Sequence, residues 1–402
     1  MRQNFKVIGL VSGGHFLSHY YILVLPPLFP MLRNELDVSY TALGAALAAF
    51  NAVTALIQAP MGFLVDRYGA PEILIGGLML FGLSMALIGA FPTYPALAFL
   101  MAVAGLGNAV FHPGDYAILS SAVEPERLGR AFSIHSFAGY LGFAAAPVTI
   151  VFLTGVIGWR TALMASGVVG VAFALLMLMN RAALRKRIRQ VDTNPAVAGP
   201  QTVKDIRLLL SAPIVMAFLF FVMLALSQGG VMSFGVSALQ ALYGVPLIEA
   251  NVPLSAFLFA SVIGVLAGGA MADRVGYYER IVAVCLVVGA LTIGAVAALA
   301  PPLWLVTVLF VIGGFSFGVI ASPRDLIVLA VTPPGSSGKV FGLVTTGLNA
   351  GNVITPLLFA VTLDSGGPRL VFWLAASFSL LTLVSVAATS ALSRKQFHET
   401  AH

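Results

Sequence analysis

The sequence has 402 residues, of which 59% are hydrophobic and 9% charged, and its mean hydropathy is +0.99. Soluble domains contain roughly 25% charged residues, so this composition excludes a chain of soluble domains, and the single cysteine, Cys285, excludes a disulfide-stapled scaffold. The formal net charge of +6 does not indicate a nucleic-acid partner, because the 21 Lys and Arg residues are spread between hydrophobic segments.

Twelve apolar runs follow one another along the chain, each near the length of about 20 residues that a helix needs to cross a bilayer. In chain order they are 7–30, 41–65, 72–91, 94–123, 128–156, 159–182, 208–238, 246–271, 281–299, 302–331, 340–363 and 370–391. The first run contains His15, Ser18 and His19 and is not followed by a small-residue cleavage site, so we expect a helix there and not a signal peptide.

The positions of the basic residues predict how the chain is oriented. If the N-terminus is cytoplasmic, most of the 21 Lys and Arg residues lie at the inner ends of the runs. Cytoplasmic loops carry such an excess, so we expect a multi-pass protein of the inner membrane with both termini in the cytoplasm. The polar stretch 181–207 separates six runs from six, which predicts an N-terminal bundle over 1–182, a cytoplasmic linker over 183–207 and a C-terminal bundle over 208–402.

An internal repeat relates the two halves of the sequence. Residues of the first half recur in order in the second half at a nearly constant offset: Gly62, Asp66, Arg67 and Gly69 as Gly269, Asp273, Arg274 and Gly276, and Pro113 and Asp115 as Pro323 and Asp325. Such matches indicate a duplicated six-helix unit. We therefore expect an all-α membrane protein with twelve transmembrane helices in two pseudo-symmetric six-helix bundles.

Two short loops carry a resemblance to a known family. Gly62-Phe63-Leu64-Val65-Asp66-Arg67-Tyr68-Gly69 and its echo Gly269-Ala270-Met271-Ala272-Asp273-Arg274-Val275-Gly276 resemble the major facilitator superfamily, and the resemblance covers essentially the whole length. It implies two six-helix bundles, alternating access, and inner loops whose charges hold the cytoplasmic ends together in the outward-open state. The gating residues implied in this way are Asp66, Arg67, Arg130, Asp273 and Arg274; the alternative is that these loops only fix the topology.

Departures from the family pattern limit what the resemblance implies. The family usually has a basic pair after Gly69, whereas Ala70, Pro71 and Glu72 follow here. Met101 stands where the family's drug exporters often carry an arginine, and the Gly-Pro motif of antiporters is degenerate over 139–147. The stretch 111–113, Phe-His-Pro, looks similar to the fosmidomycin-resistance branch but is too short to identify a substrate.

Ionisable residues within the predicted spans are the main candidates for function. A charged side chain at the centre of a membrane helix costs about 2.5 to 3.5 kcal/mol on insertion scales, so such residues are rare and usually face a cavity. The residues of this kind are His15, His19, His112, Asp115, His135, Arg324 and Asp325. His15 and His19 are four residues apart, and His112 and Asp115 are three apart, so each pair shares a helix face.

A histidine beside a carboxylate can exchange protons near neutral pH, because the imidazole pKa is about 6.5 and responds to its surroundings. We therefore predict proton coupling by His19, His112, Asp115 and His135, with the His112 and Asp115 pair as the preferred site. For each single histidine, the alternative is a neutral imidazole that hydrogen-bonds a neighbouring helix. A divalent-metal site of His15, His19, His112 and Asp115 is another alternative, although Arg324 argues against a cationic cargo.

Arg324 is the one basic residue deep within a predicted span, and it needs an anion because its guanidinium stays charged. The partners open to it are the adjacent Asp325, Asp115 across a central cavity, or a carboxylate or phosphate of a substrate. The predicted substrate-binding residues are Arg324, Asp325, Gln228, Asn349 and Asn352, of which the three amides serve equally well as helix-packing residues.

Prolines and glycines within the runs predict how the helices bend and pack. Pro113 and Pro323 are expected to kink matching helices, since each removes a backbone donor. Gly264 and Gly268 are expected to let helices approach closely.

The function we expect is secondary active transport of a small organic solute, with an anion slightly favoured, coupled to protons. The alternatives are a drug or metabolite efflux antiporter, a divalent-metal transporter, or a non-transporting membrane sensor with the carrier fold. An enzyme is not expected: a nucleophile-elbow pattern at 314–318 lies within an apolar helix, and Walker and dinucleotide motifs are absent from the sequence. The expected partners are the solute, protons and the lipid bilayer, with no nucleic acid, cofactor or resident metal, and we expect a monomer.

Overall fold

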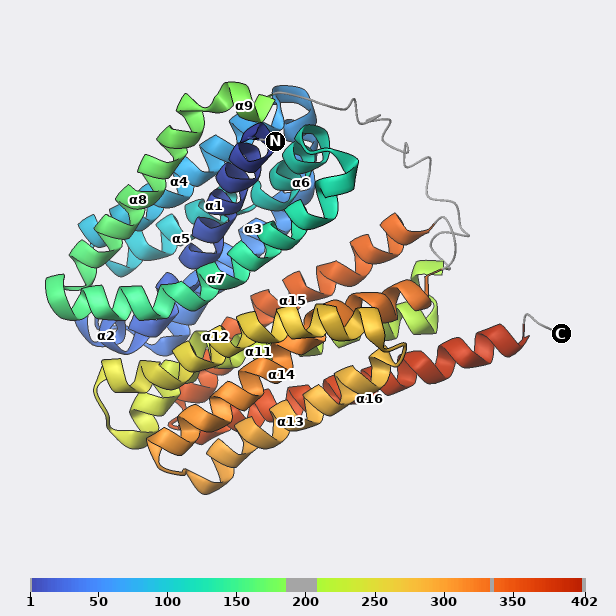
Figure 1. The fold of residues 1–402 in the computed structure, drawn as a ribbon. Helices are drawn as coiled ribbons and strands as arrows, with labels where there is room; N and C mark the ends of the chain where they lie inside the picture. The colour runs from blue at the N-terminus through green and yellow to red at the C-terminus, as the bar shows by residue number, and fades with distance from the viewer. Residues whose placement is uncertain (1, 186–207, 333–335, 400–402) are drawn as a thin grey trace. The chain divides into compact units, whose positions relative to one another are not determined.

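The computed structural model of the chain describes residues 2–185, 208–332 and 336–399, and every regular element in these ranges is a helix (Figure 1). Twelve helices or helix groups among the described residues are long and apolar enough to cross a membrane. The predicted all-α membrane fold with twelve spans is therefore confirmed.

The first of two compact units comprises Met1–Thr193 and Leu247–Asn251. Its described helices are α1 (Arg2–Val24), η1 (Pro26–Leu28), α2 (Phe29–Glu35), α3 (Tyr40–Tyr68), α4 (Ala70–Ala90), α5 (Tyr94–Asn108), α6 (Phe111–Ala122), α7 (Pro125–Ile157), α8 (Trp159–Met179) and α9 (Arg181–Arg185).

The second unit comprises Asn194–Pro246 and Val252–His402. Its described helices are α11 (Ala212–Tyr243), α12 (Leu247–Arg274, of which the first five residues cluster with the first unit), α13 (Tyr278–Leu299), α14 (Leu303–Ala330), α15 (Ser337–Asp364) and α16 (Pro368–Glu399). Most of the predicted linker at 183–207 lies outside the described residues, so the domain boundaries proposed from the sequence stay a prediction.

Local sequence signals explain where several helices begin and end. The Ser39 side chain caps α3 by accepting a hydrogen bond from the backbone N–H of Ala42 at 3.1 Å, and Thr93 caps α5 in the same way through Ala96. Between α3 and α4, Gly69 adopts a φ of 97°, a region that L side chains rarely enter. This residue therefore allows the tight turn between α3 and α4.

The first span is longer and less regular than the predicted run 7–30. It extends over Phe5–Glu35, and its α-helix ends at Val24 before the short helix η1 and then α2. Pro26, Pro27 and Pro30 lack backbone donors, so a continuous α-helix cannot pass through this segment with its hydrogen bonds complete.

The fourth span is interrupted, whereas its counterpart in the second unit is not. Helix α5 ends at Asn108 and α6 begins at Phe111. Pro113 explains the interruption, because it cannot donate to the carbonyl of Ala109 four residues earlier. Pro323, its match in the repeat, lies inside the continuous helix α14. The expected similarity of the two proline sites therefore does not extend to the helix break.

Helices α12 and α14 approach so closely that only glycine fits at the crossing. A side-chain carbon at Gly264 would collide with the carbonyl oxygen of Phe315, and one at Gly268 would collide with that of Val319. The Ser261 hydroxyl donates a hydrogen bond to the carbonyl of Gly314 at 2.9 Å across the same crossing. The predicted packing role of Gly264 and Gly268 is confirmed.

Replacing Gly264 with Ala is expected to destabilise the protein, because the added methyl group meets backbone atoms that cannot move aside. Overpacking of this kind costs about 1–3 kcal/mol. Gly342→Ala is the matched control, since nothing lies within 4 Å of a side-chain carbon at that position of α15. Thermal unfolding in detergent should give a lower midpoint for Gly264→Ala than for the control, and equal midpoints would contradict this packing.

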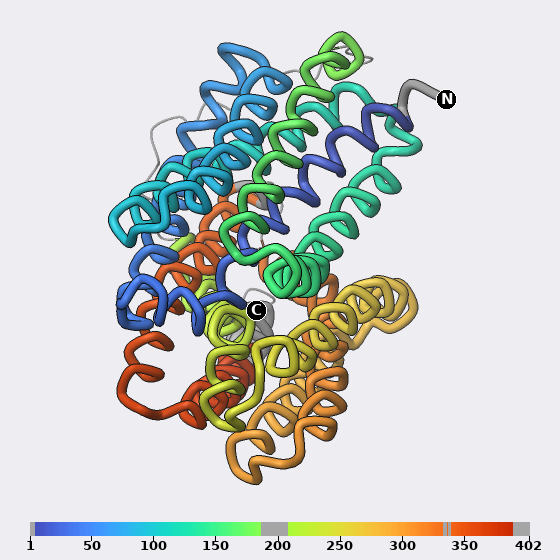
Figure 2. Tube along the Cα trace, turned by 90° about the vertical axis from the view of Figure 1, so that its left-hand side faces the viewer, coloured from blue at the N-terminus to red at the C-terminus, as the bar shows by residue number. Residues whose placement is uncertain are grey.

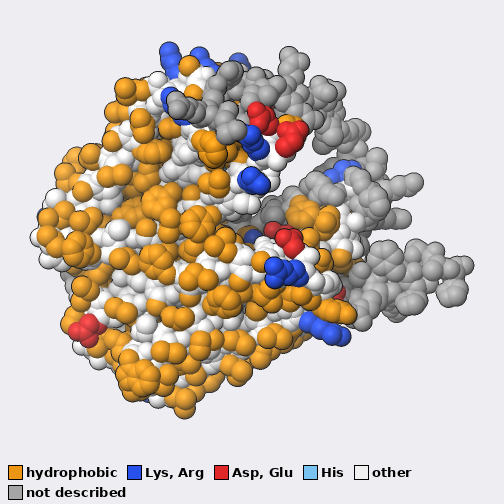
Figure 3. Space-filling model, in the orientation of Figure 1, with side chains coloured by type: hydrophobic (Ala, Val, Ile, Leu, Met, Phe, Trp, Pro, Cys, Tyr) orange, Lys and Arg blue, Asp and Glu red, His pale blue; other side chains and the backbone are white. Residues whose placement is uncertain are grey.

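Large apolar side chains are exposed along many spans. Leu56 is 74% exposed, Phe63 78% and Phe152 61%, and hydrophobic side chains cover most of the face drawn in Figure 3. A water-soluble protein rarely exposes such an area, whereas helices that face lipid do. The chain is therefore a multi-pass membrane protein.

Glu72, which replaces one of the basic residues usual after Gly69 in the resembled family, has a specific partner. The Arg185 side chain, at the end of α9, donates a hydrogen bond from Nε to Glu72 Oε1 at 2.6 Å. Both side chains are partly exposed. An acidic residue at this position therefore links the start of α4 to α9 through an ion pair.

Candidate functional site

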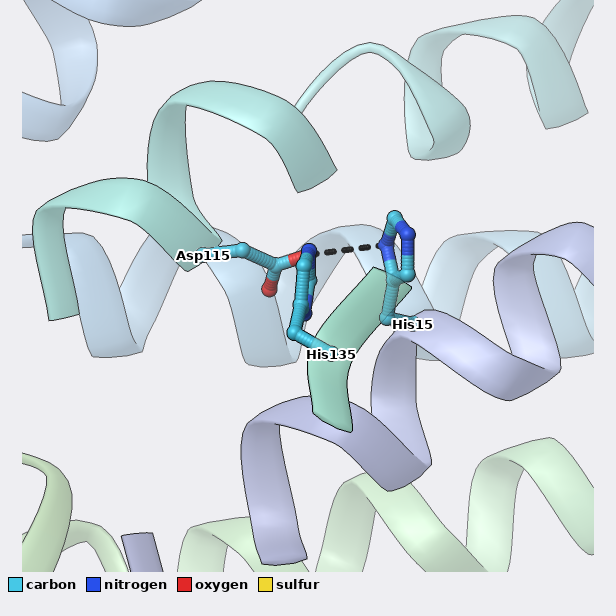
Figure 4. Close-up of side chains that lie close together, drawn as sticks. All are labelled: His15, Asp115 and His135. Atoms are coloured by element: carbon cyan, nitrogen blue, oxygen red, sulfur yellow. Dashed lines mark ion pairs between the residues drawn. The ribbon is translucent and has the colours of Figure 1, made fainter. Parts of the chain in front are cut away.

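Three buried titratable side chains from three helices of the first unit lie close together. His15 on α1 places its Nδ1 3.0 Å from Asp115 Oδ2 on α6, and His135 on α7 places its Nε2 3.6 Å from the same oxygen (Figure 4). The rings of His15 and His135 stack with centroids 3.7 Å apart. We call these three residues the buried triad.

Burial is nearly complete for all three members of the triad. Asp115 is 0% exposed, His135 2% and His15 4%. Both Asp115 carboxyl oxygens and both His135 ring nitrogens are buried without a well-oriented hydrogen bond to another described residue. Leaving a buried polar group without such a bond costs about 1–3 kcal/mol, so the arrangement is expensive for folding. Groups kept at such a cost are candidates for function.

The other two histidines within the spans, His19 and His112, lie next to His15 of the triad. The His19 ring lies 4.3 Å from the His15 ring and 4.3 Å from Phe143 on α7. The His112 side chain is exposed, and its ring lies 5.8 Å from His15 and 6.1 Å from Tyr116.

The preferred pair of His112 and Asp115 does not form an ion pair in the described structure. The Asp115 contacts come instead from His15 and His135 on neighbouring helices. Residues three apart share a helix face, but here that spacing leaves one side chain exposed at the start of α6 and the other in the interior. The described contacts of Asp115 therefore do not include His112, and the proposed coupling role of both residues stays a prediction.

Glycines on α7 bring the triad together. A side-chain carbon at Gly139 would lie 2.8 Å from His15 Nε2 and 2.9 Å from His19 Cε1, and one at Gly142 would collide with the carbonyl of Phe16. Helices α1 and α7 lie side by side in both views (Figures 1 and 2). The absence of side chains at these two positions therefore sets the distance between the imidazoles and α7.

Gly139→Ala is expected to displace the His15 and His19 rings and to reduce any activity that depends on the triad. The new methyl group meets movable side-chain ends and not backbone, so the loss of stability should be small. Gly155→Ala, on the same helix with nothing within 4 Å, is the control. Proton-driven uptake into proteoliposomes should fall for the first variant only; equal uptake by both would contradict the positioning role.

The triad offers three ligand atoms that lie within 4.8 Å of one another, a spacing that makes a metal ion worth testing. The ring planes of His15 and His135 are inclined by only 28°. Imidazole binds metals through lone pairs in the ring plane, and the lone pairs of stacked rings run side by side instead of converging on a tetrahedral centre. The arrangement as described therefore does not present converging lone pairs to a metal ion.

Arg324 in the second unit has the neighbouring carboxylate as a partner. Its Nε donates a hydrogen bond to Asp325 Oδ1 at 3.1 Å, and its guanidinium lies 5.2 Å from the centre of the Phe221 ring. The Arg324 side chain is 21% exposed and that of Asp325 52%. Arg324 and Asp325 thus form an ion pair, although adjacent side chains on a helix point in different directions. The proposed contact with Asp115 would join the two units and stays a prediction.

The three amide residues predicted to bind substrate are at least partly accessible. Gln228 and Asn349 are half-buried and Asn352 is exposed. The predicted gating residues are all exposed, and none forms an ion pair with another described residue: Asp66, Arg67, Arg130, Asp273 and Arg274. Arg67 instead lies over the ring of Tyr68, 5.3 Å from its centre.

His15 is the residue whose importance the sequence understated. The sequence predicts that it lies within a span but gives no reason to assign it to proton coupling, whereas in the structure it makes the shortest contact with Asp115. Its spacing of four from His19 indicated a shared face but not which helix that face meets. One of the other polar contacts in the unit, from the Asn108 amide to the Thr54 hydroxyl at 3.4 Å, has no signal in the sequence pattern.

The chain is similar to known membrane transporters. The model of the Major Facilitator Superfamily matches residues 11–295 and 223–399. The fosmidomycin resistance protein of Escherichia coli is 24% identical over 85% of this chain and 82% of its own length. The probable nitrate transporter NarT of Staphylococcus epidermidis is 21% identical over 95% of this chain and 94% of its own.

A solved structure resembles the fold over nearly the whole length. It is a bacterial homologue of the human lysosomal transporter Spinster, in an inward-facing and occupied conformation, with a TM-score of 0.79 and 15% sequence identity. The match covers 98% of this chain and 97% of that one.

Proposed function

This chain belongs to the Major Facilitator Superfamily and is a secondary transporter, and from this premise we propose that it couples the movement of a small anionic solute to protons. The transporter works by alternating access in the inner membrane, as a monomer with both termini in the cytoplasm. The observation that carries the proposal is the buried triad of His15, Asp115 and His135.

The triad supports proton coupling because imidazole and carboxyl groups exchange protons near neutral pH. One nitrogen of each imidazole lies within 3.6 Å of Asp115 Oδ2, so the carboxyl group and the two rings can hold one proton among them. The state with a proton and the state without differ by a full charge in a dry interior, so each state favours a different packing of α1, α6 and α7. Such a difference is what a coupling site requires.

Arg324 supports an anionic solute. The residue is mostly buried in an apolar helix, where a permanent cation needs negative charge nearby. Its partner Asp325 is 52% exposed, so an incoming carboxylate or phosphonate can compete with Asp325 for this cation. Two relatives are named for anions, since nitrate is an anion and fosmidomycin a phosphonate.

The proposed gating residues complete the cycle. Asp66, Arg67 and Arg130 of the first unit and Asp273 and Arg274 of the second are exposed at helix ends, where charges can pair and separate as access alternates. An ion pair between exposed side chains contributes at most about 1 kcal/mol. Separating such pairs when the carrier opens therefore costs little free energy.

Flux into proteoliposomes tests the proposal. Purified full-length protein is reconstituted and given a pH gradient of either direction, with nitrate, fosmidomycin, Zn²⁺ and tetraphenylphosphonium as separate probes. Accumulation of an anion that follows the proton gradient is expected. If the gradient drives accumulation of tetraphenylphosphonium alone, the protein is an efflux antiporter. If it drives accumulation of Zn²⁺ alone, the protein is a metal transporter.

The sensor alternative makes a different prediction in the same experiment. A protein that keeps the carrier fold without transport would bind a probe and raise the unfolding temperature without any flux. Binding of an anion with no uptake in either direction would therefore overturn the proposed transport function.

A further inference from the structure

Asp115 is completely buried, so a proton must reach it through other side chains. The polar side chains nearest to the carboxyl group are those of His15 and His135, which are themselves at most 4% exposed. Two polar side chains at the edge of this cluster are exposed, His112 and Tyr116, both on α6. The His19 ring lies 4.3 Å from that of His15, but this side chain is less exposed than His112 and its Nδ1 is buried. The two exposed side chains are therefore the candidates for the beginning of a route.

The ring contacts favour His112 as the beginning of the route. Its ring lies 5.8 Å from that of His15, and His15 in turn contacts Asp115 directly at 3.0 Å. Tyr116 lies 6.0 Å from the His135 ring, whose contact with Asp115 is longer, at 3.6 Å. Imidazole also transfers protons near neutral pH, whereas a phenol with a pKa near 10 does so poorly.

We propose that His112 is the port through which protons enter and leave the buried triad, with His15 as the relay between His112 and Asp115. This inference rests on the proposed proton coupling and assigns its route. It separates a residue that carries protons, His112, from the residue that stores them, Asp115.

Each step of the route conserves protons. The exposed imidazole of His112 takes a proton from water and passes it, directly or through one bridging water, to the second ring nitrogen of His15. His15 then releases its Nδ1 proton to Oδ2 of Asp115 and is left neutral, in the other tautomer. The return of His15 to its first tautomer completes one cycle, in which water has lost one proton and the carboxylate has gained it.

The titratable groups around this route come from every helix packed on α6. On these helices the described groups are Lys6, His15, His19, Tyr20 and Tyr21 on α1; Tyr40, Asp66, Arg67 and Tyr68 on α3; Glu72 on α4; Asp115 and Tyr116 on α6 itself; Glu126, Arg127, Arg130, His135 and Tyr140 on α7; and Arg181 and Arg185 on α9. Glu72 and Arg185 are paired with each other. The imidazoles are therefore the groups on this route suited to carry a proton at neutral pH.

A solute-free experiment tests the route. Purified protein in detergent is subjected to a pH jump, and infrared difference spectroscopy follows the carbonyl band of a protonated carboxyl group. Asp115→Asn must remove this band, which identifies it. In His112→Ala the band should form to a similar extent but about a hundredfold more slowly, and free imidazole in the buffer should restore the rate.

The outcomes separate the route from the proposed function. Tyr116→Phe, the matched variant one turn along α6, should keep the wild-type rate. Slowing by Tyr116→Phe and not by His112→Ala, or slowing by His112→Ala that imidazole does not relieve, would overturn the assignment of the port. Absence of any band that depends on Asp115 would instead overturn the proposed proton site, and the proposed route with it.

Discussion

Replacing Asp115 with Asn is expected to abolish solute accumulation driven by a proton gradient and to leave counterflow exchange of solute largely intact. Asparagine has nearly the same shape as aspartate but cannot take up a proton, so the coupling step is lost while the cycle of the loaded carrier remains. Without coupling, and with the membrane potential held at zero, the inner concentration of an anionic solute can only equal the outer one. The measurement is uptake and counterflow of the same labelled solute in matched proteoliposomes.

Glu124→Gln is the control for this prediction. It makes the same change from carboxyl to amide at an exposed side chain that pairs with Arg127 at the start of α7. It should accumulate solute like the wild type. Accumulation by Asp115→Asn that equals the control would mean that the triad does not hold the coupling proton.

Arg324→Lys is expected to weaken binding of an anionic solute by about tenfold to a hundredfold. Lysine keeps the positive charge but loses the planar fork that contacts a carboxylate or phosphonate through two parallel hydrogen bonds. The loss of one charge-assisted hydrogen bond, about 1.5–3 kcal/mol, corresponds to this range. Binding is measured by the dependence of uptake rate and of the unfolding temperature on solute concentration.

The role of Arg324 can be separated from that of a structural ion pair. Arg127→Lys makes the same exchange at a partly exposed pair and should leave affinity unchanged. If Arg324→Lys lowers the unfolding temperature without solute and keeps the affinity, then Arg324 stabilises α14 through Asp325 and does not contact solute.

Most of the fold could be predicted from the sequence because membrane helices have a simple physical requirement. Each span needs about 20 apolar residues, and each of the twelve predicted runs overlaps one of the twelve candidate spans among the described residues. The departures lie at prolines, where local geometry decides. Pro26 and Pro27 end α1 before the first span is complete, and Pro113 divides α5 from α6, whereas Pro323 is tolerated inside α14.

The site was predicted in its residue types but not in its contacts. Intramembrane histidines and Asp115 stand out because charge at membrane depth is costly. Which of them meet depends on how α1, α6 and α7 pack, and this packing is set by Gly139 and Gly142, which carry no chemical signal of their own. Spacing along one helix identified His112 as the partner of Asp115, whereas contacts between helices place His15 and His135 there.

Counting the protons that accompany solute binding tests the central claim most directly. Calorimetric titration of the purified protein with an anion identified by the flux experiment, in two buffers of different ionisation enthalpy, gives the number of protons taken up or released per bound solute. The account predicts a non-zero number for the wild type near neutral pH and none for Asp115→Asn. Solute binding without proton exchange in the wild type, across the pH range in which transport occurs, would contradict it.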